Sequence, residues 1–267
     1  MTLTITEIRA LLEAHGIRPT KALGQHFLAD PNTAERIVRL ARVHAGDRIV
    51  EVGPGVGSLT VALLDAGAHV CAIEVDRHVV PVLEDVTAGR DIEIVAADAL
   101  RVDWSSLLGD RSFAMVANLP YNVATPIVID ALERAPMIDR FLVMVQREVG
   151  ERLAAAPGDD AYGAVSVKVA YFAEAKVVGR VPATVFLPPP RVESVLVRLT
   201  RRREPPVVAD PNRLFALVRA GFATRRKTLR RALDGLVDSD AFARAAVDPS
   251  ARAETLSLDD WARLSAE

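Results

Sequence analysis

Short apolar runs alternate with segments of helical periodicity over the first 146 residues of the chain. Each run is bounded by glycine or polar residues, as expected of buried strands. We predict strands at 48–52, 69–75, 92–98, 113–119 and 140–146. Helical patterns separate them at 58–67, 77–86 and 125–134. This alternation predicts an α/β fold built on a doubly wound parallel sheet.

The sequence indicates where the helix at 125–134 begins. Thr125 is expected to be its N-cap, with Pro126 at the first helical position, where the missing N–H is tolerated.

Two later strand-like runs, 164–173 and 194–200, are expected to finish the sheet. Residues 201–211 mix charge with proline and are predicted to form a linker. Helical patterns follow, so a small α-helical domain is expected at 212–267 after a large domain at 1–200.

Composition narrows the class of protein. Half of the 267 residues are apolar, which is enough for a sizeable core, and the net charge of −2 gives no global sign of a nucleic-acid partner. The lone Cys71 excludes an internal disulfide and fits a reducing compartment. No secretory pattern and no apolar run of membrane-spanning length is visible, so we expect a cytoplasmic protein.

The stretch "EVGPGVGSLT" places glycines between the first predicted strand and its helix. Gly53 and Gly55 would let a ligand approach the backbone closely. Glu74 ends the next strand, where a carboxylate can accept both hydroxyls of a ribose, and Asp98 ends the third, facing an adenine edge. The pattern indicates an adenosine-bearing cofactor, and the G-x-G-x-G spacing disfavours a dinucleotide. A ligand-free turn with solvated strand-end charges is the alternative.

The stretch "ANLPYN" adds an amide, a rigid corner and a ring at the same edge of the sheet. The exocyclic N6 of adenine is a poor nucleophile because its lone pair is delocalised into the ring. Asn118 can accept an N6 hydrogen with its side-chain oxygen, and Leu119 with its carbonyl. Pro120 fixes φ at the corner, and Tyr121 can stack on an extruded base. Attack on a sulfonium methyl needs positioning more than a general base. A strand end with a packed tyrosine is the alternative.

Nine stretches together resemble the bacterial small-subunit ribosomal RNA adenine dimethyltransferase family, also called the kasugamycin-resistance methyltransferases. They span about residues 20 to 235 in the family's order. They read "LGQHFLAD", "VEVGPGVGSLT", "AIEVD", "AADAL", "ANLPYNVATP", "MVQREVGERL", "AYGAVSVKVAYF", "FLPPPRVESVLVRL" and "GFATRRKTLRRAL".

The resemblance implies a Rossmann-like class I methyltransferase fold that uses S-adenosylmethionine. It implies N6,N6-dimethylation of two adjacent adenosines in a hairpin near the 3′ end of 16S rRNA, and a role in small-subunit biogenesis. The implied partner is 16S rRNA within a small ribosomal subunit or its precursor, and the enzyme is expected to be a monomer. Residues 1–200 would form the catalytic domain, with the helical segment 1–45 closing over the cofactor.

The resemblance also assigns roles to the residues of this chain that match the family's motifs. The implied cofactor-binding residues are His26, Leu28, Gly53, Gly55, Glu74, Asp98 and Asn118. The implied catalytic residues are Asn118, Leu119, Pro120, Tyr121 and Phe186, the last as a second ring against the target base. Without the resemblance, a core position before the polyproline turn is the favoured interpretation of Phe186. His26 departs from the family, which usually has Asn there, and a histidine makes the local charge pH-dependent. No metal is expected, since the histidines lack ligand spacing.

The C-terminal end is basic. Residues 191–267 carry 15 Lys and Arg against 11 Asp and Glu, a balance of +4, which leaves −6 for the remainder. The stretch "RRKTLRRAL" concentrates the predicted RNA-binding residues Arg225, Arg226, Lys227, Arg230 and Arg231. A solvated helix face is the alternative. Apolar residues at helical spacing are expected to face a core here: Leu214, Val218, Phe222, Leu229, Leu233 and Leu236.

Two rival functions remain open. The antibiotic-resistance methyltransferases of large-subunit rRNA share the glycine loop and the "NLPY" type of corner, although "AYGAVSV" and "RRKTLRRAL" favour the small-subunit enzyme. The second rival is a ribosome-assembly or nucleic-acid-binding module with dispensable chemistry. The presence of Glu74, Asp98 and Asn118 favours an active enzyme.

Overall fold

The computed structural model describes residues 3–17, 25–224 and 226–267. The chain divides into two compact units, Met1–Gly150 with Lys176–Arg201 and Glu151–Ala175 with Arg202–Glu267. This division differs from the one expected from the sequence, because residues 151–175 cluster with the C-terminal unit and not with the domain at 1–200. The chain therefore leaves the first unit after residue 150 and returns to it at residue 176.

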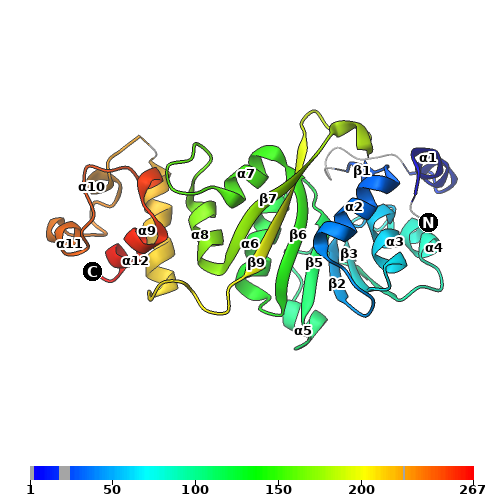
Figure 1. Cartoon of the computed structure of the whole chain (residues 1–267), viewed down its shortest axis with the longest axis horizontal. Coiled ribbons are helices and arrows are strands. Elements are labelled where there is room, and N and C mark those ends of the chain that lie inside the picture. Colours follow the sequence, from blue (N-terminus) through cyan, green and yellow to red (C-terminus); the bar gives the residue numbers. More distant parts are fainter. Residues whose placement is uncertain (1–2, 18–24, 225) are drawn as a thin grey trace. The chain divides into compact units, whose positions relative to one another are not determined.

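The described residues of the sheet form seven strands in the order β4-β3-β2-β5-β6-β9-β7 (Figure 1). They are β2 (Arg48–Val52), β3 (His69–Glu74), β4 (Ile92–Ala96), β5 (Phe113–Asn118), β6 (Ile138–Gln146), β7 (Ala173–Val181) and β9 (Ser194–Arg201). Neighbours from β4 to β6 pair in parallel, and β9 pairs antiparallel with β6. The α/β fold class and its five predicted parallel strands are confirmed, with strand ends shifted by one or two residues.

The order of the strands reverses between β2 and β5. The chain builds outward from β2 through β3 to β4, and then returns to place β5 on the other side of β2. A reversal of this kind opens a crevice at the carboxyl ends of the two central strands, because the connections leave in opposite directions. The fold thus predicts a ligand site next to the ends of β2 and β5.

A second, two-stranded sheet joins distant parts of the chain. The strands β1 (Phe27–Leu28) and β8 (Phe186–Leu187) pair antiparallel, with Leu28 opposite Phe186. The short 3-10 turn η2 (Ala183–Val185) precedes β8. Strands of two residues leave no periodicity in a sequence, so this pairing was not predicted.

Seven helices among the described residues belong wholly or partly to the first unit. They are α1 (Ile5–Ala14), α2 (Pro31–Ala41), α3 (Ser58–Asp65), α4 (Val80–Val86), α5 (Trp104–Leu108), α6 (Ala124–Arg134) and α7 (Arg147–Ala154). The start predicted for α6 was wrong, because its N-cap is Val123 and Thr125 is already helical. Pro126 still falls in the first turn, where its missing N–H removes no intrahelical bond.

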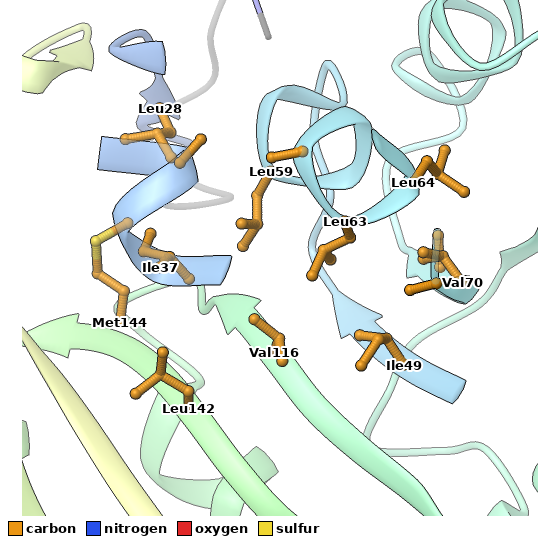
Figure 2. Close-up of a cluster of buried hydrophobic side chains, with 14 of the residues drawn as sticks. Leu28, Ile37, Ile49, Leu59, Leu63, Leu64, Val70, Val116, Leu142 and Met144 are labelled. Carbon is orange, nitrogen blue, oxygen red and sulfur yellow. The ribbon is translucent and has the colours of Figure 1, made fainter. Parts of the chain in front are cut away.

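The core of the first unit lies between the sheet and the helices α2 and α3 (Figure 2). Ile37 of α2 and Leu63 of α3 point toward Val116 of β5 and Ile49 of β2. Consecutive residues of β5, 114–117, are all buried. Since successive side chains of a strand point to opposite faces, both faces of the central sheet are covered. This burial fixes the strand ends that carry the predicted site residues.

The run at 164–173 is a helix, so its prediction as a strand was wrong. The structure has α8 (Ala164–Phe172) there, and β7 starts at Ala173. The Ser166 hydroxyl accepts from the Gly163 N–H at 3.1 Å and donates to the Arg152 carbonyl at 2.6 Å, which fixes the first turn. Val167 packs in the core of the second unit. Alternating valines favour a strand only weakly, and packing of a helical face overrides that preference.

The second unit is helical, as predicted. Its further elements are α9 (Pro211–Ala223), α10 (Leu229–Ala232), α11 (Ser239–Arg244), η3 (Ala253–Thr255) and α12 (Leu258–Ser265). The predicted core positions are buried or partly buried except Leu236, which is 42% exposed, so that prediction was wrong. The chain has already turned at the end of α10, where the Leu236 N–H donates to the Leu233 carbonyl at 2.9 Å. The predicted linker, 201–211, runs from the last residue of β9 to the first residue of α9.

Candidate functional site

A pocket lies at the carboxyl ends of β2, β3, β4 and β5, beside the reversal of strand order. Its wall comes from residues 25–28, the turn after β2, the ends of β3 and β4, and the corner at 118–121. The empty space, open mouth included, is about 880 Å³. This is within the range of small-molecule sites, which runs from roughly 300 to 1,000 Å³. The edge of the sheet at which the sequence predicts a ligand site therefore carries a cavity of suitable size.

The glycine turn after β2 is tightly enclosed. Gly53 and Gly55 have φ values of +71° and +57°, a region that side chains with a Cβ rarely adopt. A Cβ on Gly53 would lie 3.1 Å from the Pro120 side chain, and one on Gly55 would lie 2.8 Å from the Phe27 ring. Both positions thus require glycine, and the turn brings bare backbone to the pocket.

Glu74, at the end of β3, holds this turn in place. Its Oε2 accepts from the Gly55 N–H at 3.0 Å, and its Oε1 accepts from the Asp76 N–H at 2.9 Å. Burial raises the pKa of the Glu74 carboxyl, and the bonds from backbone N–H groups oppose that rise. Each carboxylate oxygen has two lone pairs, so both can still accept from ligand hydroxyls.

Asp98 lies two residues beyond the end of β4 and lines the same pocket. Its Oδ1 accepts from the Leu100 N–H at 3.0 Å, and Arg101 lies 3.5 Å from its Oδ2. The side chain is 43% exposed, which puts it at the open rim. The structure therefore brings Glu74 and Asp98 to one cavity, as the sequence predicted.

Asn118 is the last residue of β5 and faces the pocket from the opposite side. Its Nδ2 donates to the main-chain carbonyl of His26 at 3.2 Å. This contact uses the NH₂ group, so Oδ1 is the atom that can accept a hydrogen bond from a ligand. The Leu119 N–H donates to the Met144 carbonyl at 3.1 Å, which ties the corner to β6.

Tyr121 is held at two points. Its hydroxyl is 2.6 Å from the Ser194 Oγ, and its ring stacks on the His26 ring with centroids 5.3 Å apart and planes at 29°. The His26 Nδ1 donates to the Pro188 carbonyl at 2.7 Å, because a carbonyl can only accept. Burial raises the pKa of the Tyr121 hydroxyl, and the contact with Ser194 opposes the rise. The ring is thus fixed before any ligand arrives.

Phe186 is not part of the pocket wall. It is 1% exposed and packs in the core beside Leu28, its partner across β1 and β8. Leu28 does line the pocket, as expected of a residue that closes over a cofactor. The role of Phe186 as a second ring stays a prediction of the resemblance.

Sequence reasoning missed three polar residues of the pocket region. Glu51 is buried in the wall, where it accepts from the Thr60 hydroxyl at 2.7 Å, and burial raises its pKa to about 8. Ser58 also lines the pocket, and Ser194 orients Tyr121. Glu51 and Ser58 flank the glycines that drew attention to this stretch. A charged residue inside the apolar run "RIVEV" was the available signal for Glu51.

The predicted RNA-binding cluster is on the surface of the second unit. Arg226, Lys227, Arg230 and Arg231 are exposed, and none of these four forms an ion pair with another described residue. Arg225 lies outside the described residues. The cations of this cluster are accordingly available to a polyanion.

The described part of the chain shows neither a metal site nor a membrane span. No group of three or more His, Cys, Asp or Glu residues there could hold a metal ion. None of its helices has the length and apolar character required to span a membrane.

The sequence matches the ribosomal RNA adenine dimethylase family over residues 17–267. It is 48% identical to ribosomal RNA small subunit methyltransferase A of Thermobifida fusca, covering 98% of this chain and 95% of that one. The enzyme of the same name from Streptomyces coelicolor is 47% identical, with 97% and 94% covered.

Two solved structures share the fold over most of the chain. A dimethyladenosine transferase from Plasmodium falciparum gives a TM-score of 0.76 at 24% identity, covering 90% of this chain and 96% of that one. The 23S rRNA methyltransferase ErmE gives a TM-score of 0.71 at 27% identity, covering 90% and 98%. The chain therefore shares its fold with these two transferases.

Proposed function

This chain belongs to the ribosomal RNA adenine dimethylase family, and we propose that it dimethylates N6 of two adjacent adenosines in a hairpin near the 3′ end of 16S rRNA. S-adenosylmethionine is the methyl donor. The observation that carries the proposal is that Asn118, Glu74 and Asp98 line one pocket, with β5 on the other side of β2 from β3 and β4. An acceptor for the target amine thus faces the groups that suit an adenosine-bearing cofactor.

The residues of the pocket fit this cofactor. Gly53 and Gly55 form a cradle that a Cβ would fill, so the backbone can approach the ligand. Glu74 would hold the ribose hydroxyls with both carboxylate oxygens, and Asp98 would accept from the adenine amine. When bound, the cofactor supplies an electrophilic methyl group on a sulfonium.

Asn118 and Leu119 orient the nucleophile. In the first transfer the Asn118 Oδ1 and the Leu119 carbonyl accept the two N6 hydrogens, which favours a pyramidal nitrogen and directs its lone pair; in the second transfer the singly methylated nitrogen has one hydrogen left to donate to these acceptors. The neutral amide of Asn118 cannot take a proton, so in each transfer the proton passes from the cationic nitrogen to water after the methyl has moved from sulfur to nitrogen. Positioning of the two reactants therefore supplies the main part of the rate enhancement.

Tyr121 holds the extruded base by stacking. The contacts with His26 and Ser194 fix the plane of the ring in advance. Stacking on an aromatic ring contributes about 1–3 kcal/mol per base. Pro120 packs against the glycine turn, so the corner and the cofactor cradle keep a fixed spacing.

The basic cluster of the second unit would bind phosphates of 16S rRNA in a small subunit or its precursor. Replacing Arg226 and Lys227 by Gln should weaken subunit binding and flatten its log-log dependence on salt by about 0.7–0.9 per lost contact. Arg111→Gln, at an exposed arginine of the first unit, is the control and should change neither. An unchanged salt slope in the double variant would mean that the cluster is a solvated surface.

A specific observation favours one other substrate. The likeness to ErmE makes adenine methylation of 23S rRNA the second candidate. Labelled cofactor should be offered to purified small and large subunits from a strain that lacks the modification. We expect label in the small subunit only, at two adjacent adenosines mapped by primer extension. Label in the large subunit would support the second candidate, and label in neither would support a binding module without chemistry.

A further inference from the structure

Arg201, the last residue of β9, binds the C-terminal end of α6. Its Nη1 donates to the Leu132 carbonyl at 2.8 Å, and its Nη2 donates to the carbonyls of Ala131 and Ala135, both at 3.0 Å. Its Nε donates to the Ile138 carbonyl, just beyond the helix, at 2.7 Å. Carbonyls at this end of a helix run short of N–H partners, and a cation there also suits the negative end of the helix dipole. One guanidinium therefore fixes where α6 ends.

The other end of α6 continues directly from the corner that carries Tyr121. The N-cap is Val123, and no side chain among the described residues caps the first turn. The Val123 N–H donates to the Pro120 carbonyl at 3.1 Å, which joins the helix to the corner. Val123 and Ile127 both line the pocket. A displacement of α6 along its axis would therefore move the corner and this part of the pocket wall together.

The strand β9 holds the corner as well as the far end of α6. Ser194 is the first residue of β9, and its Oγ lies 2.6 Å from the Tyr121 hydroxyl. The strand has eight residues, so its ends lie about 23 Å apart at roughly 3.3 Å per residue. Every residue from Ser194 to Thr200 pairs with β6, which makes the strand a rigid support. The segment from Tyr121 to Ala135 is thus attached at both of its ends to one strand.

We propose that Arg201 is a positioning residue for the target base, because it sets the place of α6 along its axis and thereby the place of the Tyr121 ring. The inference rests on the proposed function, which makes Tyr121 the stacking surface for that base. Ser194 holds the ring directly, and Arg201 acts on the same ring from the far end of the helix. Loss of either contact should loosen the same unit, although the two residues lie at opposite ends of β9.

The first test measures amide hydrogen exchange in the protein without ligand. Arg201→Lys keeps the charge but lacks the planar fork of donors that reaches several carbonyls at once. We expect exchange about fivefold faster at the amides of Val123 and Ile127, the size of effect that one or two neutral hydrogen bonds produce. These amides lie at the end of α6 remote from Arg201, so their response reports a shift of the whole helix. Arg201→Met, which removes the donors altogether, should enlarge the effect.

The matched control is Arg198→Lys, on the same strand. The Arg198 Nη2 donates to the Leu40 carbonyl at the C-terminal end of α2, at 2.9 Å. The substitution therefore loosens an equivalent contact to a helix that does not continue from the corner. It should speed exchange in α2 and leave Val123 and Ile127 unchanged.

The second test is a double-variant cycle in methyl transfer to small subunits, run as single turnovers at saturating cofactor. Arg201→Lys should slow transfer about threefold, and by a smaller factor in the Ser194→Ala background, where the ring is already loose. Residues more than about 10 Å apart usually give additive effects, so this shortfall indicates a shared rigid unit. Arg198→Lys and Ser194→Ala should be additive. Cofactor affinity, measured by calorimetry, should not change in any of these variants.

The outcomes separate the inference from the function. Faster exchange confined to residues 128–135 in Arg201→Lys, or additive losses with Ser194→Ala, would overturn the positioning role and leave Arg201 as a group that only ends the helix. Weaker cofactor binding in Arg201→Lys would also overturn it, because the residue would then act on the glycine turn. Failure of the wild-type chain to methylate small subunits would instead overturn the proposed function, while the exchange experiment would still decide whether Arg201 controls the corner.

Discussion

The glycine side of the pocket and its Asn118 side are held in place by different groups. On the glycine side, backbone N–H groups bond to the carboxylate of Glu74, and each of them lies within 20 residues of Glu74 along the chain. On the other side, the Tyr121 hydroxyl meets Ser194, 73 residues away, and the Asn118 amide meets the His26 carbonyl, 92 residues away. The glycine side is thus a local structure, and the Asn118 side is assembled from distant segments.

This difference predicts how each side tolerates change. The glycine turn has no side chain to lose, so it should be disturbed mainly by adding atoms or by altering the charge of the buried acids. The Asn118 side depends on single side-chain contacts, so deleting one atom should misplace the reacting groups. The substitutions below test this contrast, beginning with the largest expected effect.

Asn118→Ala should reduce methyl transfer most. It removes the acceptor for the N6 hydrogen, and loss of a preorganised polar group of this kind slows chemistry by about 10²–10³-fold. Single-turnover assays should show this loss, while calorimetry should show cofactor affinity within about tenfold of the wild type. Asn122→Ala, at an exposed neighbouring amide, is the control and should behave as the wild type. Near-normal transfer by Asn118→Ala would contradict the assignment.

Glu51→Gln should change how stability depends on pH. Burial raises the pKa of Glu51 from 4.5 to about 8, because the folded chain favours the protonated carboxyl. The contribution of this proton to the free energy of unfolding is therefore fully present below pH 4.5 and is lost as the pH rises through 8. The stability of the variant relative to the wild type should therefore rise between pH 5 and 8, by at most about 1.4 kcal/mol per pH unit.

The Glu51 measurement is urea unfolding at several pH values in a Trp261→Phe background, which leaves Trp104 of the first unit as the reporter. Asn122→Ala, at an exposed amide that does not titrate, serves as the control and should give a constant difference from the wild type. A constant difference for Glu51→Gln as well would show that this carboxyl does not hold an extra proton in the folded chain.

Gly55→Ala should damage the glycine side through added atoms. The alanine would have to keep the positive φ of Gly55, and its Cβ would lie 2.8 Å from the Phe27 ring. The backbone strain alone costs about 1–2 kcal/mol, and the contact with Phe27 should move the turn and weaken cofactor binding. Gly89→Ala has the same kind of φ, +73°, with nothing within 4 Å, so it should lose stability without losing affinity. Equal affinities of the two variants would argue against a tight cradle.

Ser194→Ala and Tyr121→Phe should each slow transfer by a few-fold, the effect of one neutral hydrogen bond of about 0.5–1.5 kcal/mol. Since they remove the two partners of one contact, the double variant should be no slower than either single variant. Tyr121→Ala should be slower than all of them because it also removes the stacking surface. Additive losses in the double variant would show that Ser194 acts on something other than the ring.

The sequence predicts the local structure of the glycine side well, because the rules that determine that structure are local. The run at 48–52 ends at a glycine turn, and parallel strands share one edge at their carboxyl ends, which places Glu74, Asp98 and Asn118 together. The predicted strand β2 has the observed bounds for the same reason.

On the Asn118 side, the sequence predicted which residues line the pocket but not the contacts that hold them in place. The contact of Asn118 with His26 uses a main-chain carbonyl, which every residue has, so no letter in the sequence marks it. Ser194 lies in an apolar run whose pattern indicates only a strand. The helix at 164–172 was mistaken for a strand since its valines fit either structure, and packing in the second unit decided between them.

The distance between Tyr121 and Ser194 along the chain also sets an order of events during synthesis. A ribosome makes the chain from its N-terminus, and segments fold as they emerge. The glycine turn and Glu74 can form their contacts once the first hundred residues are out, but β6 remains an edge strand until Ser194–Arg201 arrives to pair with it. The nascent protein can therefore form the glycine turn well before Ser194 is available to hold the Tyr121 ring, and residues 27–28 find their partner strand only when residues 186–187 have been made.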